Sequence, residues 1–143
     1  MQNEAPRKFH ITFYTQNPAR LAGFWAYALK YTQKPPPAGF NSWEEFAAET
    51  GTAEQRVLVH PAGAMPPFLF WKVKTPKRAK NYMHLDVDAG GGPGVPLAER
   101  KKRVRAEAER LAAHGATRIR EVECGDWFWI PMRDPDGNEF CLQ

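Results

Sequence analysis

Two histidines hold matched places in two similar stretches of this chain. Imidazole binds divalent metals and exchanges protons near neutral pH, so these are the residues best suited to chemistry. His10 begins one stretch and is followed after 50 residues by His60, and His84 begins another and is followed after 50 residues by Asp134. A self-similar pattern of this length is typical of a duplicated structural unit. We therefore expect two related modules around a shared cleft, with one histidine of each module facing into it.

The residues around each histidine predict a half-buried strand. Residues 8–15 alternate between apolar and polar side chains, and residues 82–88 do the same. A period of two places alternate side chains on opposite faces of a strand. The histidine of each segment shares the polar face, with Tyr14 in the first segment and Asp86 in the second. If the apolar faces pack against helices, the polar faces line the cleft.

Helices and further strands must follow each of these strands to hold it in place. Asn17 and Pro18 supply an N-cap and a first-turn proline, and Ser42 with Glu45 forms a capping box for a second helix. The other expected elements are strands at 56–59 and 68–73, a helix from Pro96 to Gly115, and strands at 118–122, 127–132 and 139–143. A glycine-rich loop at 90–94 lacks both the Walker lysine and the GxGxxG pattern, so it predicts a flexible connection and not a phosphate site.

The composition is that of a soluble globular protein. The chain has 143 residues, 43% of them hydrophobic and 25% charged, with a net charge of +4. Basic residues gather at 72–80 and 100–103 without any zinc-finger, helix-turn-helix or RNA-binding signature, so we expect no nucleic-acid partner. Cys124 and Cys141 are too few for a disulfide scaffold. No segment is long and apolar enough for a membrane span, and residues 1–8 lack the apolar run of a signal peptide, so we expect a cytoplasmic protein.

Three segments resemble a known family. Residues 17–25 (NPARLAGFW), 80–87 (KNYMHLDV) and 134–141 (DPDGNEFC) are similar to glyoxalase-like domains of the vicinal oxygen chelate superfamily, which also includes glyoxalase I, bleomycin-resistance proteins and extradiol dioxygenases. The resemblance implies an α+β fold of two βαβββ modules that form an open, cleft-containing pair of half-barrels. It covers one domain, residues 1–143, with modules at about 8–75 and 80–143. It also implies a small-molecule ligand and a homodimer.

The resemblance further implies where a divalent metal (Zn, Fe, Ni or Mn) would bind. Metal-dependent members take ligands from the first and last strands of each module, and His10 and His84 occupy the first-strand positions. The last-strand positions depart from the pattern, because Cys141 stands where the second module usually offers glutamate and Leu69 stands at that place in the first. Cysteine can bind zinc, so His10, His84 and Cys141 are the candidate ligands. Glu139 lies two residues before Cys141, shares its face, and is the candidate general base.

Three functions remain open from these residues, and the least specific of them is a domain whose cleft serves mainly assembly. The first is an enzyme of the lyase, isomerase or dioxygenase type that acts on a small oxygen-bearing substrate with metal assistance. The alternative is a metal-free protein that binds or sequesters a small ligand, as bleomycin-resistance proteins do, and the loss of both glutamates favours it. In either case Tyr14, Trp71 and Asp86 are the expected substrate-binding residues. A thiol nucleophile at Cys141 is a further reading, but nothing in the sequence lowers the pKa of that thiol.

Overall fold

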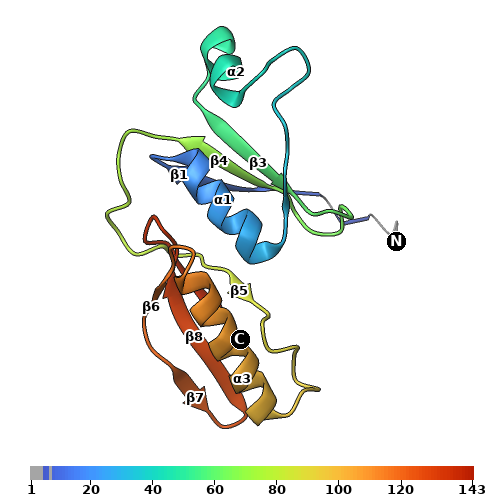
Figure 1. Ribbon diagram of the computed structural model, residues 1–143, viewed down its shortest axis with the longest axis vertical. Coiled ribbons are helices and arrows are strands. Elements are labelled where there is room, and N and C mark those ends of the chain that lie inside the picture. The colour runs from blue at the N-terminus through green and yellow to red at the C-terminus, as the bar shows by residue number, and fades with distance from the viewer. Residues whose placement is uncertain (1–4, 7) are drawn as a thin grey trace. The chain divides into compact units, whose positions relative to one another are not determined.

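The computed structural model describes residues 5–6 and 8–143. Residues 1–4 and 7 lie outside the described part. They make up most of residues 1–8, on which the expectation about a signal peptide was based. The chain divides into two compact units, Met1–Thr75 and Pro76–Gln143; the first has a sheet with two helices and the second a sheet with one helix among the described residues (Figure 1). Among the described residues, no helix combines the length and the apolar composition that crossing a membrane requires.

The N-terminal unit is a four-stranded sheet with strand order β1-β4-β3-β2. Its elements are β1 (Ile11–Thr15), α1 (Pro18–Leu29), β2 (Thr32–Gln33), α2 (Trp43–Thr50), β3 (Gln55–Val59) and β4 (Phe68–Lys72). β1 pairs with β4 in parallel, whereas the other pairs are antiparallel. A parallel pair requires a crossover, which here contains both helices and the two intervening strands.

The two helices of this unit begin where the sequence predicts. The Asn17 side chain accepts a hydrogen bond from Arg20 N, and Ser42 Oγ accepts one from Glu45 N, so each helix has a capped first turn. α1 packs on one face of the sheet through Leu21 and other buried side chains. The core of the unit consists of apolar side chains from α1, β3 and β4: Leu21, Ala22, Phe24, Trp25, Ala28, Leu58, Phe68 and Phe70.

The C-terminal unit repeats this arrangement. Its elements are β5 (Asp86–Val87), α3 (Leu97–Ala112), β6 (Thr117–Arg118), β7 (Val122–Cys124), β8 (Trp127–Arg133) and β9 (Glu139–Leu142). The strand order is β5-β9-β8-β6, with β7 paired to β8, and β5 pairs with β9 in parallel, as β1 does with β4. α3 lies along β8 (Figure 1). The predicted α+β class with two open sheets is therefore confirmed.

The strand expected at 82–88 is shorter than predicted, and this is a correction. Only Asp86 and Val87 form β5, and both Tyr82 and Met83 are fully or almost fully exposed. The reason lies in the partner strand. At Glu139 the backbone of β9 forms hydrogen bonds with the Asn81 side chain and not with a neighbouring strand. Asn81 Oδ1 accepts a hydrogen bond from Glu139 N at 3.1 Å, and Asn81 Nδ2 donates one to Glu139 O at 3.3 Å. His84 therefore precedes the strand.

Candidate functional site

Three potential metal ligands of the C-terminal unit lie close together. His84, Asp86 and Cys141 each offer one ligand atom, and these atoms all lie within 4.8 Å of one another. His84 Nε2 is 3.1 Å from Asp86 Oδ1. Zinc bonds of about 2.0–2.3 Å place neighbouring ligand atoms roughly 3.5 Å apart, so the widest spacing has to contract by only about 1 Å. Imidazole, carboxylate and thiolate are all zinc ligands, and the residues present therefore fit a divalent metal.

The register of two strands brings these residues together. Asp86 is paired with Cys141 across the parallel β5–β9 ladder, so their side chains share one face of the sheet. His84 lies two residues before Asp86 and its side chain reaches the same carboxylate. The other face carries Val87 and Leu142, which are also paired with each other. Leu142 is fully buried. The alternation of polar and apolar residues in the sequence of this segment thus corresponds to a polar face and a buried face of the sheet.

Burial raises the pKa of the Cys141 thiol above its usual value. The negative charges of Asp86 and Glu139 raise the pKa further, and the nearby Arg120 partly offsets them. The thiol is therefore protonated near neutral pH, which disfavours the reading of Cys141 as a free nucleophile. A metal ion at the cluster would reverse this, since coordination deprotonates a thiol. The raised pKa thus disfavours a free thiol nucleophile, and it also means that a metal must displace the thiol proton in order to bind Cys141.

Glu139, the expected general base, lies beside this cluster but is not a member of it. Its carboxylate is 3.9 Å from Lys80 Nζ and 3.8 Å from Arg133 Nη2, and its side chain is 31% exposed. Two residues before Cys141 on the same strand, it shares the face of the thiol. Its role as a base stays a prediction.

Two of the expected substrate-binding residues are neighbours in the N-terminal unit. Tyr14 and Trp71 are paired across β1 and β4, so their rings share a face of the sheet. Tyr14 is 68% exposed and Trp71 is half-buried. The opposite face carries Phe13, which stacks on Phe70 with ring centroids 5.4 Å apart. Asp86, the third expected substrate-binding residue, belongs instead to the ligand cluster. The sequence analysis did not predict this, because it took its candidate metal ligands from the family resemblance alone.

His10 is exposed and lies one residue before β1 in the N-terminal unit. The strand register of the N-terminal unit shows which residues occupy the positions equivalent to Asp86 and Cys141. Thr12 is paired with Leu69 across β1 and β4, as Asp86 is with Cys141 across β5 and β9. The N-terminal unit therefore presents threonine and leucine where the C-terminal unit presents carboxylate and thiol. The role of His10 as a ligand stays a prediction.

The far ends of the two 50-residue stretches have a structural role in common. His60 Nδ1 accepts hydrogen bonds from the backbone N–H groups of Ala62 and Ala64, two and four residues on. Asp134 Oδ1 accepts from Asp136 N and Asn138 N, at the same two spacings. Each residue thus caps the turn that precedes the last strand of its unit. The matched spacing from His10 and His84 reflects this shared turn.

Comparison with known proteins supports the same conclusion as the fold. Residues 10–143 match the family model described as a glyoxalase-like domain. The chain belongs to this family. Glyoxalase-like domains are part of the vicinal oxygen chelate superfamily, so the resemblance seen in the sequence is confirmed. A search of curated proteins found no match.

Solved structures with the same fold come from several bacteria. The fosfomycin resistance protein FosX from Listeria monocytogenes is 14% identical, with a TM-score of 0.65 over 97% of this chain and 93% of that one. A glyoxalase/bleomycin resistance protein/dioxygenase family enzyme from Burkholderia phytofirmans is 14% identical, with a TM-score of 0.63 over 93% and 94% of the two chains. Another FosX structure, 12% identical, with a TM-score of 0.61 over 99% and 92%, is complexed with Mn(II) and sulfate. At such identities the likeness concerns the fold.

Proposed function

We propose that this chain is a small-molecule enzyme of the lyase, isomerase or dioxygenase type, in which His84, Asp86 and Cys141 hold a divalent metal. The observation that carries the proposal is the grouping of three different ligand atoms within 4.8 Å on one face of one sheet. The superfamily supports the reaction class, and FosX structures in complex with Mn(II) support the use of a divalent metal in this fold. Homodimer formation, which the family resemblance implies, is measured by light scattering on the same sample.

Zinc is the metal that these side chains favour. A thiolate is a soft ligand that selects zinc, whereas manganese prefers carboxylate, carbonyl and water oxygens. Cys141 occupies the place where the resemblance implies glutamate, so this chain offers a soft sulfur ligand where the family pattern has a hard oxygen ligand. Because zinc must displace the proton of a thiol whose pKa is raised, its affinity is expected to increase with pH across the neutral range.

Each residue of the proposed site then has a defined task. In the metal-free protein the Asp86 carboxylate accepts a hydrogen bond from His84 Nε2, which holds the imidazole beside the other two ligands, and a bound metal would take the place of that proton. Glu139 faces the same side of the sheet as Cys141, which supports its proposed role of removing a proton from a substrate carbon or from water. When bound, the metal supplies a Lewis acid that polarises adjacent oxygens of the substrate.

A second function, metal-free binding of a planar ligand, is favoured by one observation. Tyr14 and Trp71 form an adjacent aromatic pair on the face of the N-terminal sheet opposite the stacked phenylalanines. Flat ligands stack on such rings. Under this alternative the protein sequesters its ligand without turnover, and Trp71→Ala abolishes binding whatever the metal content.

The deciding experiment is metal analysis of the purified full-length protein, followed by zinc and manganese titration. We expect one equivalent of zinc per chain, at least tenfold weaker binding in His84→Ala and Cys141→Ser, and weaker binding of manganese than of zinc. Cys141→Glu should shift the preference toward manganese, because it replaces a soft ligand with a hard one. Matched controls are His114→Ala and Cys124→Ser, which remove a histidine and a cysteine of the same unit that lie outside the cluster.

Two results would overturn the metal proposal. One is a protein that takes up no zinc at any pH between 6 and 9, a range that spans the ordinary pKa values of histidine and cysteine. The other is zinc binding that the control substitutions weaken as much as the cluster substitutions do.

Glu139→Gln tests the proposed base separately from the proposed ligands. It should leave zinc affinity unchanged and remove turnover of any substrate found.

A further inference from the structure

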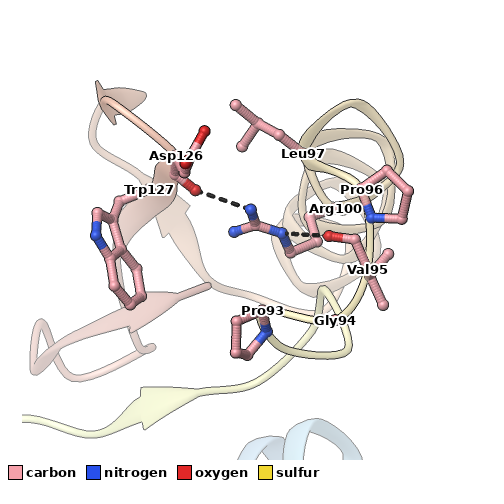
Figure 2. A pocket seen from close by; sticks show the side chains of 8 residues that line it. All are labelled: Pro93, Gly94, Val95, Pro96, Leu97, Arg100, Asp126 and Trp127. Atoms are coloured by element: carbon pink, nitrogen blue, oxygen red, sulfur yellow. Dashed lines mark hydrogen bonds between the residues drawn. The ribbon is translucent and has the colours of Figure 1, made fainter.

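A hollow of about 530 Å³ lies at the start of α3, away from the ligand cluster. Figure 2 shows the side chains that surround it, from the glycine-rich loop, the first turn of α3 and the turn between β7 and β8. Its lining consists of Pro93, Gly94, Val95, Pro96, Leu97, Arg100, Asp126 and Trp127. No residue of the proposed metal site contributes to it. Its volume falls within the range of small-molecule binding sites.

The cation of this hollow is fixed in place without a carboxylate partner. Arg100 Nε donates to Val95 O at 2.9 Å, and Nη2 donates to Asp126 O at 2.8 Å (Figure 2). Among the described residues no carboxylate forms an ion pair with Arg100, although Arg103 and Arg105 of the same helix both have one. The two carbonyls use two of the five guanidinium N–H donors. The structure therefore presents a positive charge that is held in one orientation and forms no ion pair.

The glycine-rich loop makes this placement of the arginine possible. A side chain at Gly90 would put its Cβ 3.2 Å from the Cβ and Cγ atoms of Arg100, closer than such contacts usually are. Gly91 has a φ of 93°, which residues with a side chain rarely adopt. The loop that the sequence suggested to be only a flexible connection is therefore folded against the first turns of α3. Gly90 lets the backbone lie against the stem of Arg100, and Gly91 permits the turn that follows.

An exposed aromatic ring forms the opposite side of the hollow. Trp127 is 64% exposed, although the next residue, Phe128, is buried beneath α3. Figure 2 shows the indole and the Arg100 guanidinium on the two sides of the space, with Pro93 beside them. Leu97 adds further apolar surface. An exposed tryptophan beside a fixed cation is suited to a ligand that is both flat and anionic.

We propose that this hollow binds a small aromatic carboxylate. The carboxylate accepts hydrogen bonds from the free N–H groups of Arg100, which match its two oxygens in spacing, while the ring lies against Trp127. Asp126 also lines the hollow and carries a negative charge, which opposes the anion. The site therefore selects a ligand with enough apolar surface to add to the attraction of one arginine, and a carboxylate without a ring should bind weakly.

Calorimetric titration of the full-length protein with benzoate tests this assignment. We expect saturable binding at millimolar concentrations or below, and at least tenfold weaker binding of benzamide, which lacks the charge, and of acetate, which lacks the ring. Arg100→Gln and Trp127→Ala should each weaken benzoate binding at least fivefold. Asp126→Asn should strengthen it, because it removes the opposing charge.

Matched controls separate this site from general effects. Arg103→Gln removes another arginine of α3 that also bonds to the loop, through Gly90 O, and Tyr82→Ala removes a fully exposed aromatic ring of the same unit. Neither should change benzoate affinity. Since Arg100 also ties the loop to the β7–β8 turn, Trp127→Ala is the decisive variant if Arg100→Gln lowers the melting temperature.

Three results would overturn the proposal. They are no benzoate binding at millimolar concentrations, equal binding of benzamide and benzoate, and binding that Trp127→Ala leaves unchanged. Loss of binding on Trp71→Ala instead would assign benzoate to the aromatic pair of the N-terminal unit. Because the hollow contains no proposed metal ligand, the result is independent of whether the protein binds zinc.

Discussion

The thiol of Cys141 combines two features that determine how it reacts. Cys141 lies on β9, where it is paired with Asp86 of β5. The burial of the thiol and the negative charge of Asp86 both raise the pKa of the thiol. The thiolate is the reactive form of cysteine. In the metal-free protein Cys141 should therefore be slow to react at neutral pH, and its reactivity should increase only above the usual pKa of a thiol.

Alkylation of Cys141 measures this pKa directly. In a Cys124→Ser background we expect the rate of iodoacetamide modification to reach half its maximum at a pH above the ordinary thiol value. Asp86→Asn removes a charge that raises the pKa, so the half-maximum should move to lower pH. Asp88→Asn is the matched control, because the charge of Asp88 is not among those that shift the Cys141 pKa. A half-maximum that Asp86→Asn leaves in place, or moves upward, would contradict this account.

The turn-capping residues His60 and Asp134 should differ in what they contribute to stability. Asp134 is buried, and its carboxylate accepts bonds from two backbone N–H groups and from the Asn138 amide. Asp134→Ala should lower the free energy of unfolding by about 2 kcal/mol, because charged acceptors of buried bonds are costly to remove. His60→Ala should cost less than about 1 kcal/mol, since its bonds are exposed.

Urea unfolding monitored by circular dichroism measures both losses. His60→Asp is the informative control, because it gives the N-terminal turn the same acceptor that the C-terminal turn has. It should be closer to the parent protein than His60→Ala is. Equal losses for Asp134→Ala and His60→Ala would show that burial of the cap does not matter.

At the scale of elements, the sequence predicts those features that depend on near neighbours. The caps of α1 and α2 are hydrogen bonds between residues three apart, so Asn17 and Ser42 locate both helix starts. The extent of β5 depends instead on Asn81 and Glu139, which are 58 residues apart. β2 was missed for the same reason, because its two residues are a strand only through pairing with β3.

The candidate site follows the same division. The alternation of residues 82–88 places Asp86 on the polar face, and the resemblance gives the position of Cys141, but their direct pairing is a matter of register. The hollow between Arg100 and Trp127 had no signal in the sequence. Its two side chains come together only because the glycine-rich loop and the β7–β8 hairpin lie next to each other in the folded unit.

The C-terminal end of α1 carries a local conflict that can be relieved. Lys30 caps the helix with a φ of 58°, in the left-handed region that glycine adopts more readily than any other residue. Lys30→Gly should raise the free energy of unfolding by about 1 kcal/mol. Lys102→Gly, the same change at an exposed position inside α3, should lower it by about 1 kcal/mol. Thermal unfolding measures both, and a loss of stability in Lys30→Gly would show that the lysine side chain contributes more than the strain it causes.

At the scale of the whole molecule, the two units share a topology but not its chemistry. Both pair their first and last strands in parallel, and at the paired position one unit has Thr12 with Leu69 and the other has Asp86 with Cys141. Duplicated folds tolerate such divergence because the buried face alone maintains the sheet. The polar faces are therefore free to differ, and among residues 5–6 and 8–143 a cluster of three potential metal ligands is found in the C-terminal unit alone.

Hydrogen exchange with and without zinc locates the effect of metal along the whole chain. A ligand that binds only the folded state stabilises it by about 2.7 kcal/mol at a concentration of 100 times its dissociation constant, and exchange slows where that stabilisation is felt. We expect zinc to slow exchange in β5 and β9, which carry Asp86 and Cys141, and to have no effect in Cys141→Ser. Additional protection at Ile11, beside His10, is the result that the predicted ligand role of His10 requires. Zinc-dependent protection confined to β3 and β4 would contradict the assignment, because those strands carry none of the proposed ligands.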